Sequence, residues 1–111
     1  MPNELIFKSI FFIFITLAVI LEVIGDVLFK KWSIGEKNSL FTLGLAIYFL
    51  GSIFWALSLR YEYLTKAISI FTLLNLIIIT LVGALIFKED LSLINKIGVA
   101  LGVVAIILIE L

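Results

Sequence analysis

The stretch that decides the fold is LFTLGLAIYFLGSIFWALSL, residues 40–59. These twenty residues carry no charge, and a helix of about 20 apolar residues spans the roughly 30 Å hydrocarbon core of a bilayer. Polar residues flank the stretch, from Ser33 to Asn38 before it and from Arg60 to Glu62 after it. The sequence therefore predicts a transmembrane helix here that ends near both membrane surfaces.

Three further apolar stretches have the length of a membrane span. We expect helices over residues 9–29, 67–87 and 93–109, each bounded by lysines or short polar turns. Hydrophobic residues make up 64% of the 111-residue chain, more than a soluble domain of this size needs. The predicted fold is an all-α membrane protein, a single domain of residues 1–111 with four transmembrane helices and short loops.

The composition excludes several kinds of chemistry. The sequence contains no cysteine and no histidine, so it has no thiolate or imidazole metal ligand, no cysteine nucleophile and no disulfide. Its formal net charge of zero argues against nucleic acid as a partner, because binding nucleic acid needs a clustered basic surface. We find no nucleophile paired with a base, and we expect neither enzyme activity nor a cofactor.

The basic residues orient the predicted helices only weakly. Four spans place both termini on one side of the membrane. Three basic residues lie on that side and five on the other: Lys8, Arg60 and Lys66 against Lys30, Lys31, Lys37, Lys88 and Lys96. The difference slightly favours termini outside the cell. It is small enough for insertion in both orientations, or for pairing with an oppositely oriented chain. The first apolar stretch lacks a cleavage motif, so we expect it to be retained as a span.

Glu22 is the most informative polar residue because it lies deep in the first predicted helix. It is three residues past the midpoint of residues 9–29, about 4.5 Å from the membrane centre at a rise of about 1.5 Å per residue. A carboxylate at that depth costs several kcal/mol unless it is protonated or paired. This property suits a site that exchanges protons. The alternative is a neutral acid that only hydrogen-bonds a neighbouring helix.

Asp26 follows Glu22 by one helical turn, so both carboxyls and Ala18 share one stripe of the helix. Two acids this close do not ionise independently, and we expect their titrations to be coupled. Asp26 also lies four residues before Lys30, and pairing with that lysine is the alternative. Gly25 stands beside both acids and allows another helix or a ligand to approach the backbone.

One face of the second predicted helix combines small and aromatic residues. Its members follow 4-3-4-3 spacing: Gly44, Tyr48, Gly51, Trp55 and Ser58. Opposite a buried carboxylate, such a face is suited to a flat or cationic ligand, through stacking and cation–π contacts. Packing of the small residues against another helix explains the same pattern.

The third and fourth predicted helices contribute polar and glycine positions. Ser69, Thr72 and Asn75 cover an arc of about 120° at about 100° per residue, so they can face a common cavity. The Asn75 amide needs partners at this depth, from another helix, from water or from a substrate. Gly98 and Gly102 form a GxxxG motif, which permits close helix packing within the chain and a contact in a dimer.

The segment LEVIGDVLFK, residues 21–30, resembles the first helix of the small multidrug resistance transporters, in which a glutamate precedes a short apolar stretch, a glycine and a lysine. Four spans in 111 residues, Phe54-Trp55 in the second helix and a glycine-rich fourth helix extend the resemblance over the whole chain. The third helix departs from the family pattern. Where that pattern has a glycine, a tyrosine and a tryptophan, residues 66–72 read KAISIFT.

The resemblance implies a transport mechanism for this protein. In that family the membrane glutamate binds protons and cationic substrate in competition, and two chains form an antiparallel dimer that alternates access between the two sides. Carried over by position, this role falls on Glu22. The implied partners are protons, a small-molecule substrate, the lipid bilayer, and a second copy or a paired homologous chain.

Three functions are compatible with these residues. The first is a proton-coupled exporter of small cationic or polar compounds in the cytoplasmic (inner) membrane, with Glu22 and Asp26 binding protons and substrate. Its expected cavity is lined by Ala18, Gly25, Tyr48, Gly51, Trp55, Ser69, Thr72 and Asn75. The second is a subunit of a lipid-linked sugar flippase, which residues 72–76 and 88–92 resemble. The third is a noncatalytic membrane assembly subunit whose Glu22 pairs with a basic residue of a partner.

Overall fold

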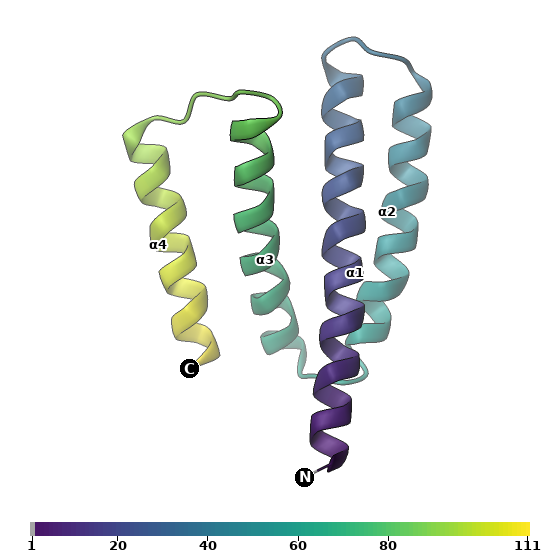
Figure 1. Cartoon of the computed structure of the whole chain (residues 1–111), viewed down its shortest axis with the longest axis vertical. Helices are drawn as coiled ribbons and strands as arrows, with labels where there is room; N and C mark the ends of the chain where they lie inside the picture. Colours follow the sequence, from purple (N-terminus) through teal and green to yellow (C-terminus); the bar gives the residue numbers. More distant parts are fainter. Residues whose placement is uncertain (1) are drawn as a thin grey trace. The chain divides into compact units, whose positions relative to one another are not determined.

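The computed structural model describes residues 2–111, which form four α-helices joined by short loops (Figure 1). The helices are α1 (Pro2–Ser33), α2 (Ser39–Ser58), α3 (Leu64–Leu85) and α4 (Leu93–Glu110). The described residues contain no β-strand. The all-helical fold predicted from the hydropathy pattern is confirmed.

Three of the helices are long and apolar enough to cross a membrane, over Asn3–Ser33, Ser39–Ser58 and Leu64–Leu85. The apolar part of α4, Leu93–Ile109, is shorter. At about 1.5 Å per residue it is roughly 25 Å long, somewhat less than the roughly 30 Å hydrocarbon core. A helix of this length is accommodated by local thinning of the bilayer or by flanking side chains that reach the headgroups.

The α1 helix is longer than predicted, since it begins at Pro2 and ends at Ser33 in place of residues 9–29. The prediction ended the helix at charged residues, Lys8 on one side and Lys30-Lys31 on the other. Charge marks the end of an apolar stretch but does not end a helix, because lysine is a good helix former whose long side chain reaches the membrane surface. The proline fits the first turn, where its missing N–H has no helical acceptor.

The α3 helix is displaced toward the N-terminus relative to the predicted range, and occupies Leu64–Leu85 in place of 67–87. A tight turn ends it. Lys88 has a φ of 52°, in the left-handed region, and the backbone N–H of Glu89 donates to the carbonyl of Gly83 at 3.0 Å. This turn satisfies a carbonyl at the helix end and directs the chain out of the helix.

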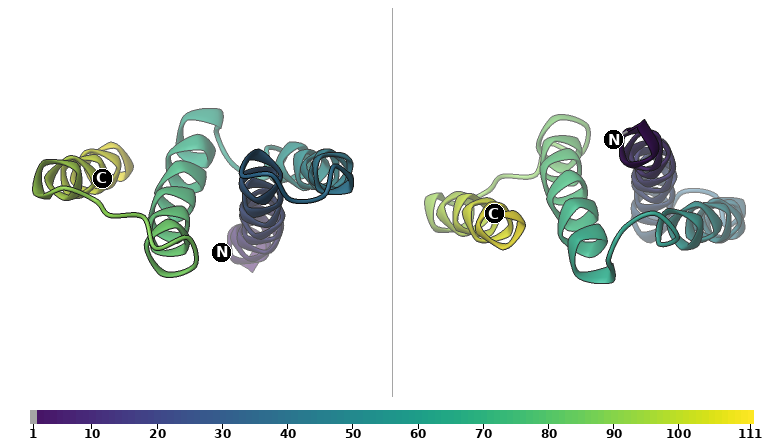
Figure 2. Two further views of the ribbon diagram at one scale, coloured as in Figure 1. Left: turned by 90° about the horizontal axis from the view of Figure 1, so that it is seen from above. Right: turned by 90° about the horizontal axis from the view of Figure 1, so that it is seen from below.

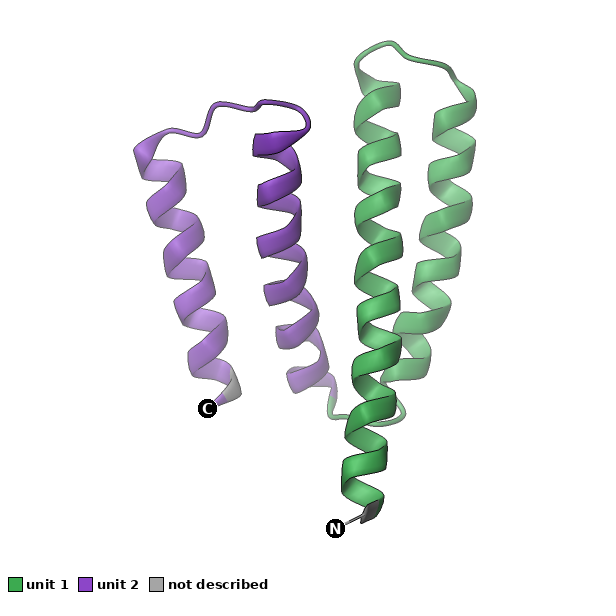
Figure 3. Ribbon diagram, in the orientation of Figure 1, with its two compact units in different colours: residues 1–63 green, residues 64–111 purple. Residues whose placement is uncertain are grey.

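The helices group into two hairpins (Figure 3). Residues 1–63 contain α1 and α2, and residues 64–111 contain α3 and α4. Within the first hairpin, α1 and α2 lie side by side, as the views from above and below show (Figure 2). Within the second, α3 and α4 contact each other much less. A single domain over residues 1–111 stays a prediction.

Glycine sets how closely α1 and α2 approach. Gly44 and Gly51 are buried on the α2 face that the residue spacing predicted. A Cβ atom at Gly51 would lie 3.3 Å from Leu21 Cβ and 3.5 Å from the carbonyl oxygen of Ala18. The backbones therefore come into near contact at this level, as small residues allow in membrane helices.

An aromatic cluster packs the end of this hairpin nearest the α1–α2 loop. The ring of Phe29 lies over Gly44, where a Cβ atom would approach Phe29 Cε1 to 2.7 Å. The centroid of Phe29 lies 5.7 Å from that of Phe41 and 5.2 Å from that of Tyr48, and Trp32 lies 4.9 Å from Phe41. These spacings are typical of attractive aromatic pairs.

Replacing Gly51 with leucine should destabilise the hairpin, because the new side chain has to displace Leu21 or separate the helices. We expect a loss of about 1–3 kcal/mol in the free energy of unfolding, the usual effect of overpacking. The measurement is denaturant unfolding in lipid bicelles. Ser52→Leu is the matched control, because Ser52 is the next residue along α2 and is exposed. Equal stability of the two variants would show that the helices do not meet at Gly51.

Candidate functional site

Glu22 lies level with the closest contact between α1 and α2. Its backbone nitrogen is 3.7 Å from the position of a Cβ atom on Gly51. Ser33, the last residue of α1, lies eleven residues further on, which is about 16 Å of helix. Gly51 lies seven residues before Ser58, the last residue of α2, which is about 10 Å. Both helices thus place Glu22 well inside their apolar stretches.

The Glu22 carboxyl is half-buried, and none of residues 2–111 as described forms a hydrogen bond or an ion pair with it. It does interact electrostatically with Asp26. A carboxyl in an apolar region without a partner is unfavourable as an anion. Its oxygen atoms are therefore available to a proton, a cation or water.

Asp26 is held differently, because the Tyr48 hydroxyl donates a hydrogen bond to Asp26 Oδ1. This bond joins α1 to α2. The sequence had offered two interpretations of Asp26, coupled titration with Glu22 or pairing with Lys30, and both concern neighbours on the same helix. The hydrogen bond to Tyr48 was missed, because residue spacing identifies neighbours along one helix but not the register between two.

Gly25 makes room for Tyr48. It is buried, and a Cβ atom there would overlap the tyrosine ring, with Tyr48 Cε2 only 2.7 Å away. On another side the ring contacts Phe29, with the centroids 5.2 Å apart. The Tyr48 ring is thus positioned by the absence of a side chain at Gly25, by the Phe29 ring, and by the bond from its hydroxyl to Asp26.

Comparison with known families shows which kind of protein has this contact between α1 and α2. A family model described as Small Multidrug Resistance protein matches residues 10–109. The chain belongs to the small multidrug resistance family. No solved structure matches it.

Membership of the small multidrug resistance family confirms the resemblance found in the sequence. The protein is a multi-pass integral membrane protein of a transporter kind, as its apolar helices also indicate. The family is not one of enzymes. Among the described residues of this small multidrug resistance protein, no group of three or more histidine, cysteine, aspartate or glutamate side chains could hold a metal ion.

The remaining predicted site residues of the first hairpin lie on the faces of α1 and α2 that pack against each other. Ala18 and Gly51 are buried against each other, so both contribute to packing. Trp55 lies one turn further along the same α2 face and is half-buried. That these residues also line a cavity in this small multidrug resistance protein stays a prediction.

Three predicted site residues belong to the second hairpin. Thr72 is exposed, and the hydroxyl of Ser69 donates to the carbonyl of Thr65 in its own helix at 2.7 Å. Asn75 Oδ1 is buried and has no hydrogen-bond partner among residues 2–111 as described. An unpaired amide oxygen is costly in an apolar region. A common cavity for these residues and Glu22 stays a prediction.

The glycines of the fourth helix are only partly used within the second hairpin. A Cβ atom at Gly102 would contact Leu76 Cδ2 at 3.4 Å, whereas one at Gly98 would meet no described atom within 4 Å. The GxxxG face is therefore open at Gly98. Its use in a dimer stays a prediction.

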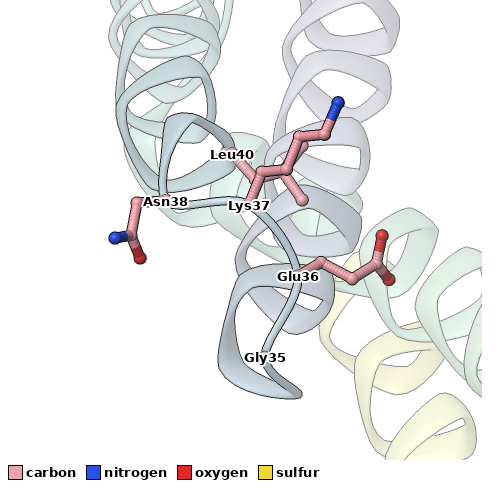
Figure 4. Close-up of a pocket in the computed structure, with 5 residues that line it drawn as sticks. All are labelled: Gly35, Glu36, Lys37, Asn38 and Leu40. Atoms are coloured by element: carbon pink, nitrogen blue, oxygen red, sulfur yellow. The ribbon is translucent and has the colours of Figure 1, made fainter.

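The loop between α1 and α2 forms an open hollow (Figure 4). Its lining residues are Gly35, Glu36, Lys37, Asn38 and Leu40. In Figure 4 the side chains of Glu36, Lys37 and Asn38 point in different directions, and Asn38 Oδ1 accepts a bond from Trp32 Nε1 at 3.3 Å. Ligand sites have polar groups that converge, so this hollow is not a candidate site.

Gly25→Ala should destabilise the protein, because the added methyl group forces the Tyr48 ring away from Asp26. Alanine gains up to about 1 kcal/mol of helix propensity over glycine, but overpacking costs about 1–3 kcal/mol. Gly102→Ala is the matched control, since its Cβ atom makes only an ordinary contact. Denaturant unfolding in bicelles should show Gly25→Ala less stable than Gly102→Ala. The reverse order would mean that the ring does not occupy this space.

Proposed function

We propose that the protein is a proton-coupled exporter of small cationic or polar compounds, and that Glu22 exchanges protons for substrate. The observation that supports this most is the state of the Glu22 carboxyl. It lies inside an apolar span, half-buried, with no hydrogen bond or ion pair from the described residues. Family membership supports transport as the kind of function.

The exchange follows from the electrostatics of one carboxyl in an apolar environment. Protonated Glu22 is neutral, and so is deprotonated Glu22 paired with a monovalent cation. The empty anion is the unfavourable state, by several kcal/mol. A conformational change that exposes the site to the other side is therefore restricted to the two loaded forms. Because proton and cation compete for the same oxygen atoms, a proton gradient drives cation transport in the opposite direction.

Alternating access requires more than one chain. Transporters of this type place the substrate near the bilayer midplane, between two halves that rock against each other. Four helices are too few to enclose such a site, and we propose a dimer, either of identical chains in antiparallel orientation or with a paired homologous chain. The near balance of basic residues between the two sides supports a chain that inserts in both orientations.

The proposed cavity brings aromatic and polar groups to Glu22. Trp55 on α2 supplies a ring face for a cation. Thr72 and Asn75 on α3 supply hydrogen-bonding groups, and the unpaired Asn75 oxygen is suited to a substrate that donates a hydrogen bond. The cytoplasmic membrane is the proposed location, because a proton gradient is available there.

Glu22→Gln should abolish proton-driven transport and leave the fold intact, because glutamine is similar in shape but neither ionises nor releases a proton. The measurement is uptake of a cation such as tetraethylammonium into proteoliposomes with an imposed proton gradient. Glu36→Gln is the matched control, since Glu36 is exposed in the α1–α2 loop, and it should transport like the parent. Gradient-driven transport by the Glu22 variant would contradict the proposed function.

Replacing both Gly98 and Gly102 with leucine should weaken association of the chains, because bulky side chains prevent close approach of helices. Crosslinking in bilayers at increasing lipid dilution measures this. The matched control places the same two leucines at Ala100 and Val104, about 200° around α4. We expect the glycine variant to dissociate at a lower dilution than the control. Equal association would remove the GxxxG face from the interface.

A further inference from the structure

We propose that Asp26 is a positioning residue that keeps the Tyr48 hydroxyl away from Glu22, so that Glu22 stays available to cation and proton. This inference rests on the proposed function of Glu22. In this role Asp26 is not a second titrating acid beside Glu22. It binds neither the substrate nor the exchanged proton, and acts only by holding the Tyr48 hydroxyl.

The two carboxyls share one stripe of α1 but differ in their partners. Asp26 accepts the hydrogen bond of the Tyr48 hydroxyl, whereas no described residue donates a hydrogen bond to Glu22. The two acids are one helical turn apart, with Cβ atoms about 5–6 Å from each other. The Tyr48 hydroxyl interacts electrostatically with both of them. One donor thus interacts with two carboxyls and is hydrogen-bonded to Asp26.

A half-buried hydroxyl in an apolar region, such as that of Tyr48, takes the acceptor that is within reach, since an unpaired donor is unfavourable there. If Asp26 could not accept, the hydroxyl of Tyr48 would turn to the long, flexible side chain of Glu22. A hydrogen bond to a charged carboxylate is stronger than one between neutral groups. The cation would then have to displace that bond, and its affinity would fall.

The packing around Tyr48 favours the bond to Asp26. Gly25 lets the ring lie against α1, and the ring of Phe29, which follows Asp26 along α1, contacts it at a centroid distance of 5.2 Å. Both contacts hold the ring toward the Asp26 and Phe29 end of the α1 face. To reach Glu22, the Tyr48 side chain would have to rotate against these contacts. The bond to Asp26 forms without such a rotation.

The test compares binding of tetraethylammonium, a cation without hydrogen-bond donors, to four purified full-length variants in lipid bicelles. Asp26→Ala should bind about tenfold more weakly than the parent, the equivalent of one hydrogen bond to a charged group. Asp26→Asn keeps an acceptor for Tyr48 and should bind like the parent. Tyr48→Phe should also bind like the parent, and adding Tyr48→Phe to Asp26→Ala should restore binding.

The restoration separates this role from two others. If Asp26 were a second ligand for the cation, Asp26→Asn would bind as weakly as Asp26→Ala, and Tyr48→Phe would restore nothing. If the bond only stabilised the hairpin, Tyr48→Phe alone would weaken binding as much as Asp26→Ala. Either pattern overturns the proposal. Failure of the proposed function gives a different result from failure of the Asp26 proposal. If Glu22 does not bind the cation, Glu22→Gln will bind it like the parent.

A measurement without ligand tests the same arrangement. The sequence contains three tyrosines, so 3-fluorotyrosine labelling gives a simple fluorine NMR spectrum in which Tyr48→Phe assigns the Tyr48 signal. Asp26→Ala should shift that signal more than Asp26→Asn, which keeps an acceptor for the hydroxyl. In the Asp26→Ala background, adding Glu22→Leu should shift it again, because the hydroxyl loses its new acceptor. If adding Glu22→Leu to Asp26→Ala leaves the Tyr48 signal unchanged, the proposal is overturned.

Discussion

Helices in a bilayer gain little from the hydrophobic effect when they associate, because lipid tails are as apolar as leucine. Their contact depends on van der Waals packing and on hydrogen bonds. In this protein three glycines allow the first two helices to meet. At Gly51 the missing side chain lets the backbone of α1 come close. Gly44 leaves space for the ring of Phe29, and Gly25 leaves space for the ring of Tyr48. The arrangement of the site follows from this contact, since it sets both the level of Glu22 and the acceptor of the Tyr48 hydroxyl.

The number and type of helices could be predicted from the sequence because the bilayer imposes one simple constraint. A stretch without charges, such as residues 40–59, has to satisfy its backbone internally and therefore forms a helix. The helix ends were predicted less well. Hydropathy detects the boundary of the apolar region, whereas α1 continues through Lys30-Lys31 to Ser33, and α3 ends at a turn formed by Lys88 and Glu89.

Two features of the candidate site could be predicted from the sequence: the depth of a residue in the membrane and the spacing of residues along one helix face. The depth of Glu22 singled it out, and the 4-3-4-3 spacing identified the α2 face on which Gly44 and Gly51 are buried. The partner of Asp26 could not be found in this way, because it depends on the register between α1 and α2. A glycine next to an acid on one helix, together with a tyrosine between two glycines on the other, is the sequence feature that indicates such a contact.

The central claim is that one carboxyl, Glu22, takes either a proton or a cation. The most direct test adds tetraethylammonium to purified protein in weakly buffered detergent solution and follows the pH together with the amount of cation bound. Competition at a single carboxyl predicts that each cation bound releases at most one proton per chain, and that Glu22→Gln neither binds the cation nor releases protons. Cation binding without proton release across the pH range, or release that persists in Glu22→Gln, would contradict the account.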